Sequence, residues 1–206
     1  MADHGFHFGN LRLGQGKWNV YDHDIRVPFF VTGPGIAQGA QSQLLGSHVD
    51  LGPTFLNLAG LDVAPEMDGR SVLSQLINNP EDPRLSADVK RRAAAVSTAT
   101  NLRPAQSIYV EYHGLGPVGA PNRLLDSFNN TYRAIRFVND TTYGNVVYAE
   151  WGSDFNFART VFVEVFDLDQ DPWQLHNIVN STSAATLAAW RELVAKLYTC
   201  QGEECR

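Results

Sequence analysis

Long apolar runs are lacking from this 206-residue chain, and so are long runs of basic residues. No stretch approaches the roughly 18 consecutive apolar residues that a transmembrane helix needs, so we expect no membrane span. The formal net charge of -6 argues against nucleic-acid binding, because such binding depends on cationic side chains that neutralise phosphates. The first ten residues, MADHGFHFGN, have neither the basic segment nor the apolar core of a signal peptide.

Cysteine is scarce as well, and its placement is informative. The two cysteines are Cys200 and Cys205, a spacing that suits a small disulfide-closed loop in an oxidising compartment. A pair of free thiols is the alternative. N-glycosylation sequons begin at Asn129, Asn139 and Asn180, which also favours a secretory compartment. Secretion without a signal peptide is contradictory, and a further N-terminal segment would resolve the contradiction.

Residue patterns divide the chain into two kinds of sequence. In the first part they predict a short strand over residues 26–31 and helices over 49–60 and 68–78. The polar residues 85–103, with Lys90 to Arg92, are typical of a solvated helix face or a linker.

From residue 107 onward, β-branched and aromatic runs alternate with Gly, Asn and Asp, which predicts an antiparallel sheet. The predicted strands are residues 108–112, 132–138, 145–151 and 161–168, and a helix is predicted over 186–198. We therefore predict an α/β piece over residues 1–80, a linker over 81–104 and an antiparallel α+β subdomain over 105–206.

The residues best suited to chemistry lie near the N-terminus. Asp3 and His4 are adjacent and can both ligate a cation, the carboxylate favouring calcium or magnesium. Lys17 follows Gly16, but a phosphate-binding loop would need glycine at position 11 and Ser or Thr at 18, where Leu11 and Trp18 stand. Lys17 is instead a mobile point charge suited to an anionic substrate group. The alternative for all three residues is an ordinary polar surface loop.

The segment ADHGFHFGNLRLGQGKWNVYDHDIRVPFFVTGPG resembles a characteristic stretch of sulfatases, most of all those that cleave glucosamine 6-sulfate esters in heparan and keratan sulfate. HVDLGPTFLNLAGLD resembles the family's next segment, and NNTY, FVEVFDLDQDPWQLHNI and CQGEEC resemble its C-terminal part. The resemblance implies an alkaline-phosphatase-like α/β sheet domain followed by a small antiparallel domain. It also implies a sulfuric-ester hydrolase that acts on sulfated sugars of glycosaminoglycans in the lysosome or outside the cell.

The resemblance implies roles for individual residues. Asp3 and His4 match one pair of the family's calcium ligands, and Lys17 matches the lysine that contacts the sulfate group. His7 lies beside the site and is a candidate substrate contact. His113, after a predicted strand, is a candidate for the sugar-binding edge, although a strand-end histidine without that role is the alternative.

The family's nucleophile is a formylglycine formed from Cys or Ser in the motif Cys/Ser-x-Pro-x-Arg, and this pentapeptide does not occur in the sequence. The adjacent aspartates that form the other pair of calcium ligands do not occur either. We therefore expect this chain to be a fragment of a sulfatase, a truncated gene product or a short isoform, that is inactive on sulfate esters by itself.

Two other functions remain open. A phosphodiesterase or phosphatase of the same superfamily also carries Asp-His-Gly, typically on zinc, although Lys17 and the DIRVPFFVTGPG segment favour a sulfatase. A non-catalytic domain that binds sulfated glycans is the second alternative, favoured by the lack of a nucleophile.

Overall fold

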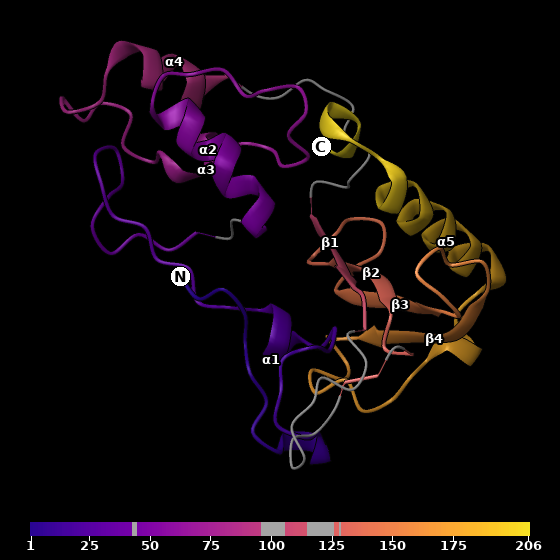
Figure 1. Cartoon of the computed structure of the whole chain (residues 1–206). Coiled ribbons are helices and arrows are strands. Elements are labelled where there is room, and N and C mark those ends of the chain that lie inside the picture. The colour runs from indigo at the N-terminus through magenta and orange to yellow at the C-terminus, as the bar shows by residue number, and fades with distance from the viewer. Residues whose placement is uncertain (43–44, 96–105, 115–125, 128) are drawn as a thin grey trace. The chain divides into compact units, whose positions relative to one another are not determined.

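The protein is described by a computed structural model, shown in Figure 1. The described residues are 1–42, 45–95, 106–114, 126–127 and 129–206. The chain forms two compact units, a sheet unit of residues 1–29 and 106–198 and a helical unit of residues 30–105 and 199–206. The predicted linker over residues 81–104 falls outside the described residues from residue 96 onward.

The sheet unit contains a four-stranded antiparallel sheet in the order β1-β2-β3-β4. Its strands are β1 Ser107–Tyr112, β2 Tyr132–Phe137, β3 Val146–Gly152 and β4 Thr160–Asp167. Each lies within one residue of its predicted bounds, and the prediction of an antiparallel sheet is confirmed. Alternating side chains along a strand point to opposite faces, so every strand contributes apolar groups to two separate layers.

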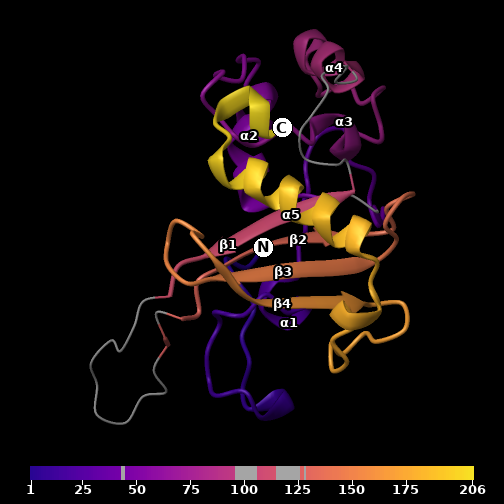
Figure 2. The same cartoon turned by 90° about the vertical axis from the view of Figure 1, so that its right-hand side faces the viewer.

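The C-terminal helix α5, Ala184–Thr199, lies across one face of this sheet (Figure 2). It was predicted over residues 186–198 and is confirmed. Trp190, Val194 and Leu197 are its buried residues, and the Trp190 ring lies 5.6 Å from the Tyr148 ring and 6.0 Å from that of Phe137. The helix therefore covers the face to which Phe137 and Tyr148 contribute.

N-terminal residues pack against the core of the sheet unit. Val20 belongs to a buried cluster with side chains from β2, β3 and β4 and with Leu168, and Tyr21 packs against it. The one-turn helix α1, Asp22–Ile25, follows directly, and the 3-10 turn η1, Asn10–Arg12, lies in the loop before it. Residues 1–29 are thus anchored in the unit that contains the sheet, although more than seventy residues separate the two in sequence.

Polar turns complete the sheet unit. The Asp171 carboxylate accepts hydrogen bonds from the backbone N–H groups of Leu175 and His176, both at 2.7 Å. Asn177 bonds the backbone of β4 at Val163 and Val165 and is followed by the 3-10 turn η3, Val179–Ser181. The Asp171-Pro172 element near the C-terminus is therefore a structural turn.

The helical unit contains η2 His48–Asp50, α2 Leu51–Leu58, α3 Leu73–Leu76, α4 Ala87–Ala94 and η4 Gly202–Cys205. The predicted helix over residues 49–60 is confirmed, with Gly60 at a positive φ of 77° beyond its end. Asp50 does not cap α2 through its side chain. Its carboxylate instead accepts hydrogen bonds from the backbone N–H groups of Ser47 and Arg70, which ties η2 to the segment before α3.

Two predictions for this part of the chain are wrong. Residues 26–31 are not a strand, because no described segment pairs with them, and Phe30 is 82% exposed. The helix predicted over residues 68–78 is only the single turn α3. Apolar runs define a strand only when a neighbour supplies the hydrogen bonds, which a sequence pattern does not reveal. In the part of the chain that the structure describes, no helix is both long and apolar enough to cross a membrane.

Candidate functional site

A loop between residues 3 and 17 brings the predicted site residues together. The backbone groups of His7 and Gly16 exchange two hydrogen bonds, with N···O distances of 2.9 and 3.2 Å. This bridge brings the end of the loop back beside its beginning, so that Lys17 Nζ lies 2.5 Å from His4 Nε2. Asp3 Oδ2 lies 3.1 Å from the same His4 nitrogen. The structure therefore gathers Asp3, His4 and Lys17 in one cluster.

Glycine at position 5 is required by the way this loop meets helix α1. The Gly5 N–H donates a 2.7 Å hydrogen bond to the carbonyl of Asp24. A Cβ atom at Gly5 would lie 1.9 Å from the carbonyl oxygen of His23, far inside van der Waals contact. The Asp-His-Gly sequence thus combines two potential ligands with the one residue type that allows so close a backbone approach.

Charges of both signs meet in this cluster. A hydrogen bond from its own backbone N–H lowers the pKa of Asp3, and the nearby His4 and Lys17 lower it further. The Asp3 side chain is 84% exposed, so its carboxylate is available to a cation. Lys17 places an ammonium group beside it, which suits an anionic substrate group such as sulfate. The cluster therefore combines candidate ligands of a cation with a positively charged group suited to an anion, and a cation bound at His4 Nε2 would displace the Lys17 ammonium from that nitrogen.

Calcium fits these residues in part. Asp3 Oδ2 and His4 Nε2 are 3.1 Å apart, a separation suited to two ligands of one cation. Calcium takes six to eight ligands, mostly oxygens, so this pair supplies only a minority of the required set. Water or other polypeptide would supply the rest. The calcium site stays a prediction.

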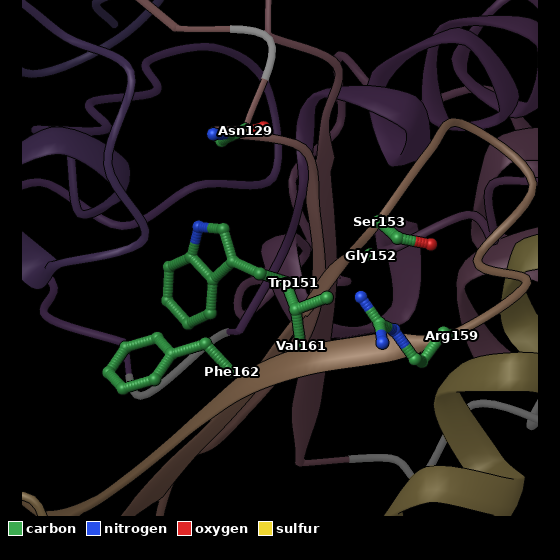
Figure 3. A pocket seen from close by; sticks show the side chains of 7 residues that line it. All are labelled: Asn129, Trp151, Gly152, Ser153, Arg159, Val161 and Phe162. Carbon is green, nitrogen blue, oxygen red and sulfur yellow. The ribbon is translucent and has the colours of Figure 1, made fainter.

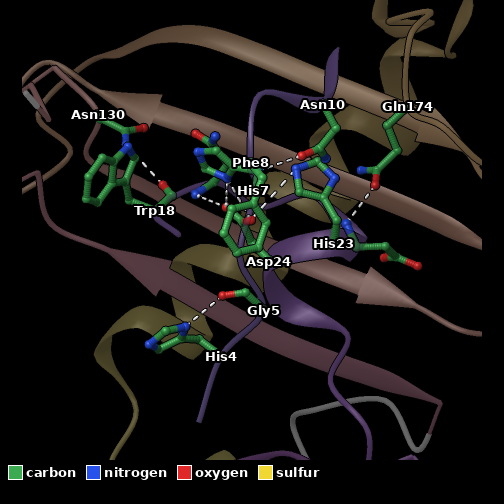
Figure 4. Close-up of polar contacts among 12 residues, drawn as sticks. His4, Gly5, His7, Phe8, Asn10, Trp18, His23, Asp24, Asn130 and Gln174 are labelled. Atoms are coloured by element: carbon green, nitrogen blue, oxygen red, sulfur yellow. Dashed lines mark hydrogen bonds and ion pairs between the residues drawn. The ribbon is translucent and has the colours of Figure 1, made fainter. Parts of the chain in front are cut away.

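His7 is held in place by a hydrogen bond to Asp24 (Figure 4). Its side chain is 1% exposed, and Nδ1 donates to the Asp24 carboxylate, with distances of 2.8 and 3.1 Å to the two oxygens. His7 also borders a cavity of about 290 Å³, whose other lining residues are Leu13, Gly14, Trp18, Asn19, Asp126, Ser127 and Asn130. A buried, hydrogen-bonded histidine has a clear packing role, and a contact with substrate remains a prediction.

His113 lies just after the end of β1, in a different environment. Its ring stacks on Phe155 with centroids 5.3 Å apart, and its Nε2 lies 3.4 Å from the Tyr198 hydroxyl. No contact among the described residues joins it to Asp3, His4 or Lys17. These contacts do not test its predicted place at a sugar-binding edge.

A hollow of the sheet unit opens at the end of β3 and the start of β4 (Figure 3). Its volume is about 450 Å³, and it is lined by Asn129, Trp151, Gly152, Ser153, Arg159, Val161 and Phe162. Neighbouring Asn130 donates to the Trp18 carbonyl and accepts from the Trp151 indole, so it links this hollow to the cavity beside His7. Asn130 and Asp24 are site-shaping residues that the sequence did not single out, although the YDHDIR segment contains Asp24.

The remaining predicted sites lie on the surface or at the C-terminus. Asn129, Asn139 and Asn180 are all exposed, as acceptors of N-linked glycans must be, and their glycosylation stays a prediction. Cys200 and Cys205 are joined in the structure, with their Cα atoms 5.4 Å apart. This pairing lies in the helical unit.

Comparison with known proteins gives consistent matches. The sequence model of the sulfatase family, described as Sulfatase, matches residues 1–61. The N-acetylglucosamine-6-sulfatase of Bos taurus is 32% identical over the whole chain, which covers 35% of that protein. The arylsulfatase of Volvox carteri is 32% identical over 99% of the chain, which covers 30% of that protein. The chain thus spans about a third of the length of these curated relatives.

Two further matches are a sulfatase that aligns with a shorter segment of the chain and a solved structure. An extracellular sulfatase SULF-1 homolog of Drosophila melanogaster is 42% identical over 37% of the chain. A solved structure concerned with the metabolism of multiple glycosaminoglycans by Bacteroides thetaiotaomicron superposes with a TM-score of 0.54 at 22% identity. That alignment covers 87% of this chain and 33% of the solved one, and it supports the fold alone.

Proposed function

Because the chain belongs to the sulfatase family, we propose that it is the C-terminal portion of a sulfuric-ester hydrolase that acts on sulfated sugars of glycosaminoglycans. N-acetylglucosamine 6-sulfate is the proposed substrate unit. The observation that carries the proposal is the cluster in which Asp3, His4 and Lys17 meet, because the sequence resemblance implies roles in metal and sulfate contact for these three residues.

Lys17 has a defined task in this proposal. Its exposed ammonium group lies beside His4 on the loop closed by the His7–Gly16 bridge, and in the proposal it leaves His4 Nε2 to contact a sulfate oxygen. Hydrolysis of a sulfate ester builds negative charge on the sulfate and on the leaving oxygen, and a fixed cation stabilises that charge. Asp3 and His4 would hold calcium beside it, and the bound ion would polarise the same sulfate group.

The nucleophile of the proposed reaction does not come from these 206 residues. The formylglycine would be supplied by a sulfatase segment that contains the Cys/Ser-x-Pro-x-Arg motif. The chain by itself is therefore proposed to be inactive, and its surface sequons and cysteine pair favour a lysosomal or extracellular location.

The test uses a polypeptide that joins this chain to a sulfatase segment containing the nucleophile. Lys17→Ala should lower kcat/KM for a 6-sulfated glucosamine substrate by roughly 100–1,000-fold, the loss typical of one deleted charge-stabilising donor. Asp3→Ala should instead raise the calcium concentration needed for half-maximal activity. Lys90→Ala, which removes a lysine of the helical unit, is the matched control and should leave both quantities unchanged.

The alternatives give other results in the same assay. Near-normal kcat/KM in Lys17→Ala would show that the assigned role is wrong. A requirement for two zinc ions, with phosphate esters as the better substrates, would favour the phosphatase side of the superfamily. Saturable binding of sulfated oligosaccharides without turnover in the joined polypeptide would favour a glycan-binding function.

A further inference from the structure

Three side chains outside the Asp3–His4 pair lie close together, two of them on helix α1 and one on the loop before it (Figure 4). They are His7, His23 and Asp24, and one potential ligand atom from each lies within 4.8 Å of the other two. We propose that these residues form a binding site for a zinc-class transition-metal cation, separate from the predicted calcium site. The proposal does not depend on sulfatase activity.

The distances suit a cation held between the three groups. Asp24 Oδ1 lies 2.8 Å from His7 Nδ1 and 3.7 Å from His23 Nε2. Ligand atoms that share one tetrahedral zinc stand about 3.3–3.4 Å apart, which lies between these two values. Zinc binding would displace the proton from His7 Nδ1. It would also lengthen the distance between His7 Nδ1 and Asp24 Oδ1 by roughly half an ångström.

The environment of His23 is the second observation that favours a ligand. Its Nε2 is buried and has no hydrogen-bond partner among the described residues. A buried polar atom without a partner is costly, and coordination to a cation would satisfy it. The His7 and His23 rings meet edge to face, 5.7 Å apart at 87°, so both imidazoles approach the same point without stacking.

The donor set selects the type of metal. Two imidazole nitrogens and one carboxylate oxygen are typical ligands of zinc, whereas calcium prefers oxygens alone. Asp24 is itself oriented, because its Oδ2 accepts a 2.9 Å hydrogen bond from the Asn19 N–H. Water would complete the four-coordinate geometry that zinc prefers. Bound metal would fasten the loop that carries Lys17 to helix α1.

The experiment titrates zinc chloride into the chelator-treated full chain by calorimetry and repeats the titration with cobalt(II), whose visible absorption reports coordination by nitrogen. One site per chain is expected. His23→Gln should weaken zinc binding by at least about 10-fold, the lower end of the loss seen even for residues behind the ligands. His176→Gln, which removes an exposed histidine of the same unit, and Asp3→Ala should leave zinc affinity unchanged.

The outcomes that overturn the proposal are equally definite. The absence of saturable zinc binding would overturn it, and so would an unchanged zinc affinity in His23→Gln. Loss of zinc binding in Asp3→Ala would instead assign the metal to the Asp3–His4 pair. His23 has a 25% exposed side chain and should tolerate substitution. If the variant does not fold, long-range ¹H–¹⁵N spectra of the unaltered chain decide the matter. Zinc should then shift His7 Nδ1 and His23 Nε2, and shifts confined to His48 and His176 would contradict the site.

Discussion

At the scale of single residues, close backbone approach shapes the candidate site. Gly5 and Gly16 both stand where any side chain would collide, Gly5 with the backbone at His23 and Gly16 with the ring of Trp18. Their role is to let the loop carrying Lys17 close onto α1. A change at either glycine acts on the geometry of the site without touching a reactive group.

Gly5→Ala tests this closeness. A Cβ atom would lie 1.9 Å from the His23 carbonyl oxygen, so the loop or α1 must move. We expect a loss of about 1–3 kcal/mol of unfolding free energy, the usual cost of overpacking, measured by denaturant unfolding. Gly33→Ala is the matched control, because a Cβ there meets nothing within 4 Å. Equal stability of the two variants would contradict the described packing.

Glu164 on β4 provides a pH-dependent test at the same scale. Burial raises the pKa of its carboxyl above the model-compound value of 4.5, and a hydrogen bond from the Tyr21 hydroxyl offsets part of this rise. The folded chain therefore binds this proton more tightly than the unfolded chain does. The contribution of Glu164 to stability falls as pH rises from about 4.5 through the raised pKa.

Glu164→Gln removes this dependence. The variant should be more stable than the unaltered chain at pH 7, and the difference should shrink as the pH approaches 4, as measured by urea midpoints across this range. Glu192→Gln serves as the comparison, because Lys196 lowers the pKa of the exposed Glu192 and its removal should slightly weaken the fold at pH 7. A constant difference between Glu164→Gln and the unaltered chain at all pH values would argue against a raised pKa.

At the scale of elements, a buried charge network joins β2, β3 and α5. Glu150 has a fully buried side chain whose carboxylate accepts from Arg133 at 2.6 Å and from the Tyr148 hydroxyl at 2.7 Å. Arg191 of α5 reaches the same carboxylate at 3.3 Å, and the Arg133 guanidinium lies over the Phe157 ring. The network ties the helix to the sheet only while every buried charge keeps a partner.

Arg133→Ala should cost about 3–5 kcal/mol of unfolding free energy, because it leaves the buried Glu150 carboxylate without its main partner. Arg191→Ala should cost less, since that side chain is 54% exposed. Lys196→Ala, which removes an exposed ion pair of the same helix, should change stability by no more than about 0.5 kcal/mol. Denaturant unfolding of the three variants measures these losses of unfolding free energy. Equal losses in all three would show that burial of the side chain does not determine the size of the loss.

At the scale of the whole molecule, the chain passes from the sheet unit to the helical unit and back, and its last residues end in the helical unit. There the turn η4 binds residues 64–68. Gly202 donates to Asp68 at 2.6 Å, Glu203 N–H donates to the Pro65 carbonyl at 3.1 Å, and the Arg206 guanidinium reaches the Met67 carbonyl at 2.9 Å. The Cys200–Cys205 bond keeps η4 in the shape that makes these contacts.

Replacing both cysteines by serine should loosen this attachment. The six-residue closed loop corresponds to about 2 kcal/mol of chain entropy on the loop-closure model. Hydrogen exchange should therefore speed up at residues 64–68 and stay unchanged in β2 and β3. The unaltered chain, made in a secretory pathway, should gain about 2 Da on reduction of its one S–S bond. Two free thiols, or unchanged exchange in the serine variant, would contradict this account.

The sequence by itself determined the four strands, the C-terminal helix and the resemblance of Asp3, His4 and Lys17 to sulfatase residues. The alternation of apolar residues along a strand and their spacing along a helix are local patterns. They can therefore be recognised without knowing which segment packs against them. Only the tertiary structure decided that residues 26–31 pair with no strand among the described residues, that residues 1–29 pack with the sheet unit, and that His7, His23 and Asp24 meet. It also decided that Glu150 is buried between two arginines. Each of these outcomes depends on which distant segment lies alongside, and no short-range pattern in the sequence specifies that choice.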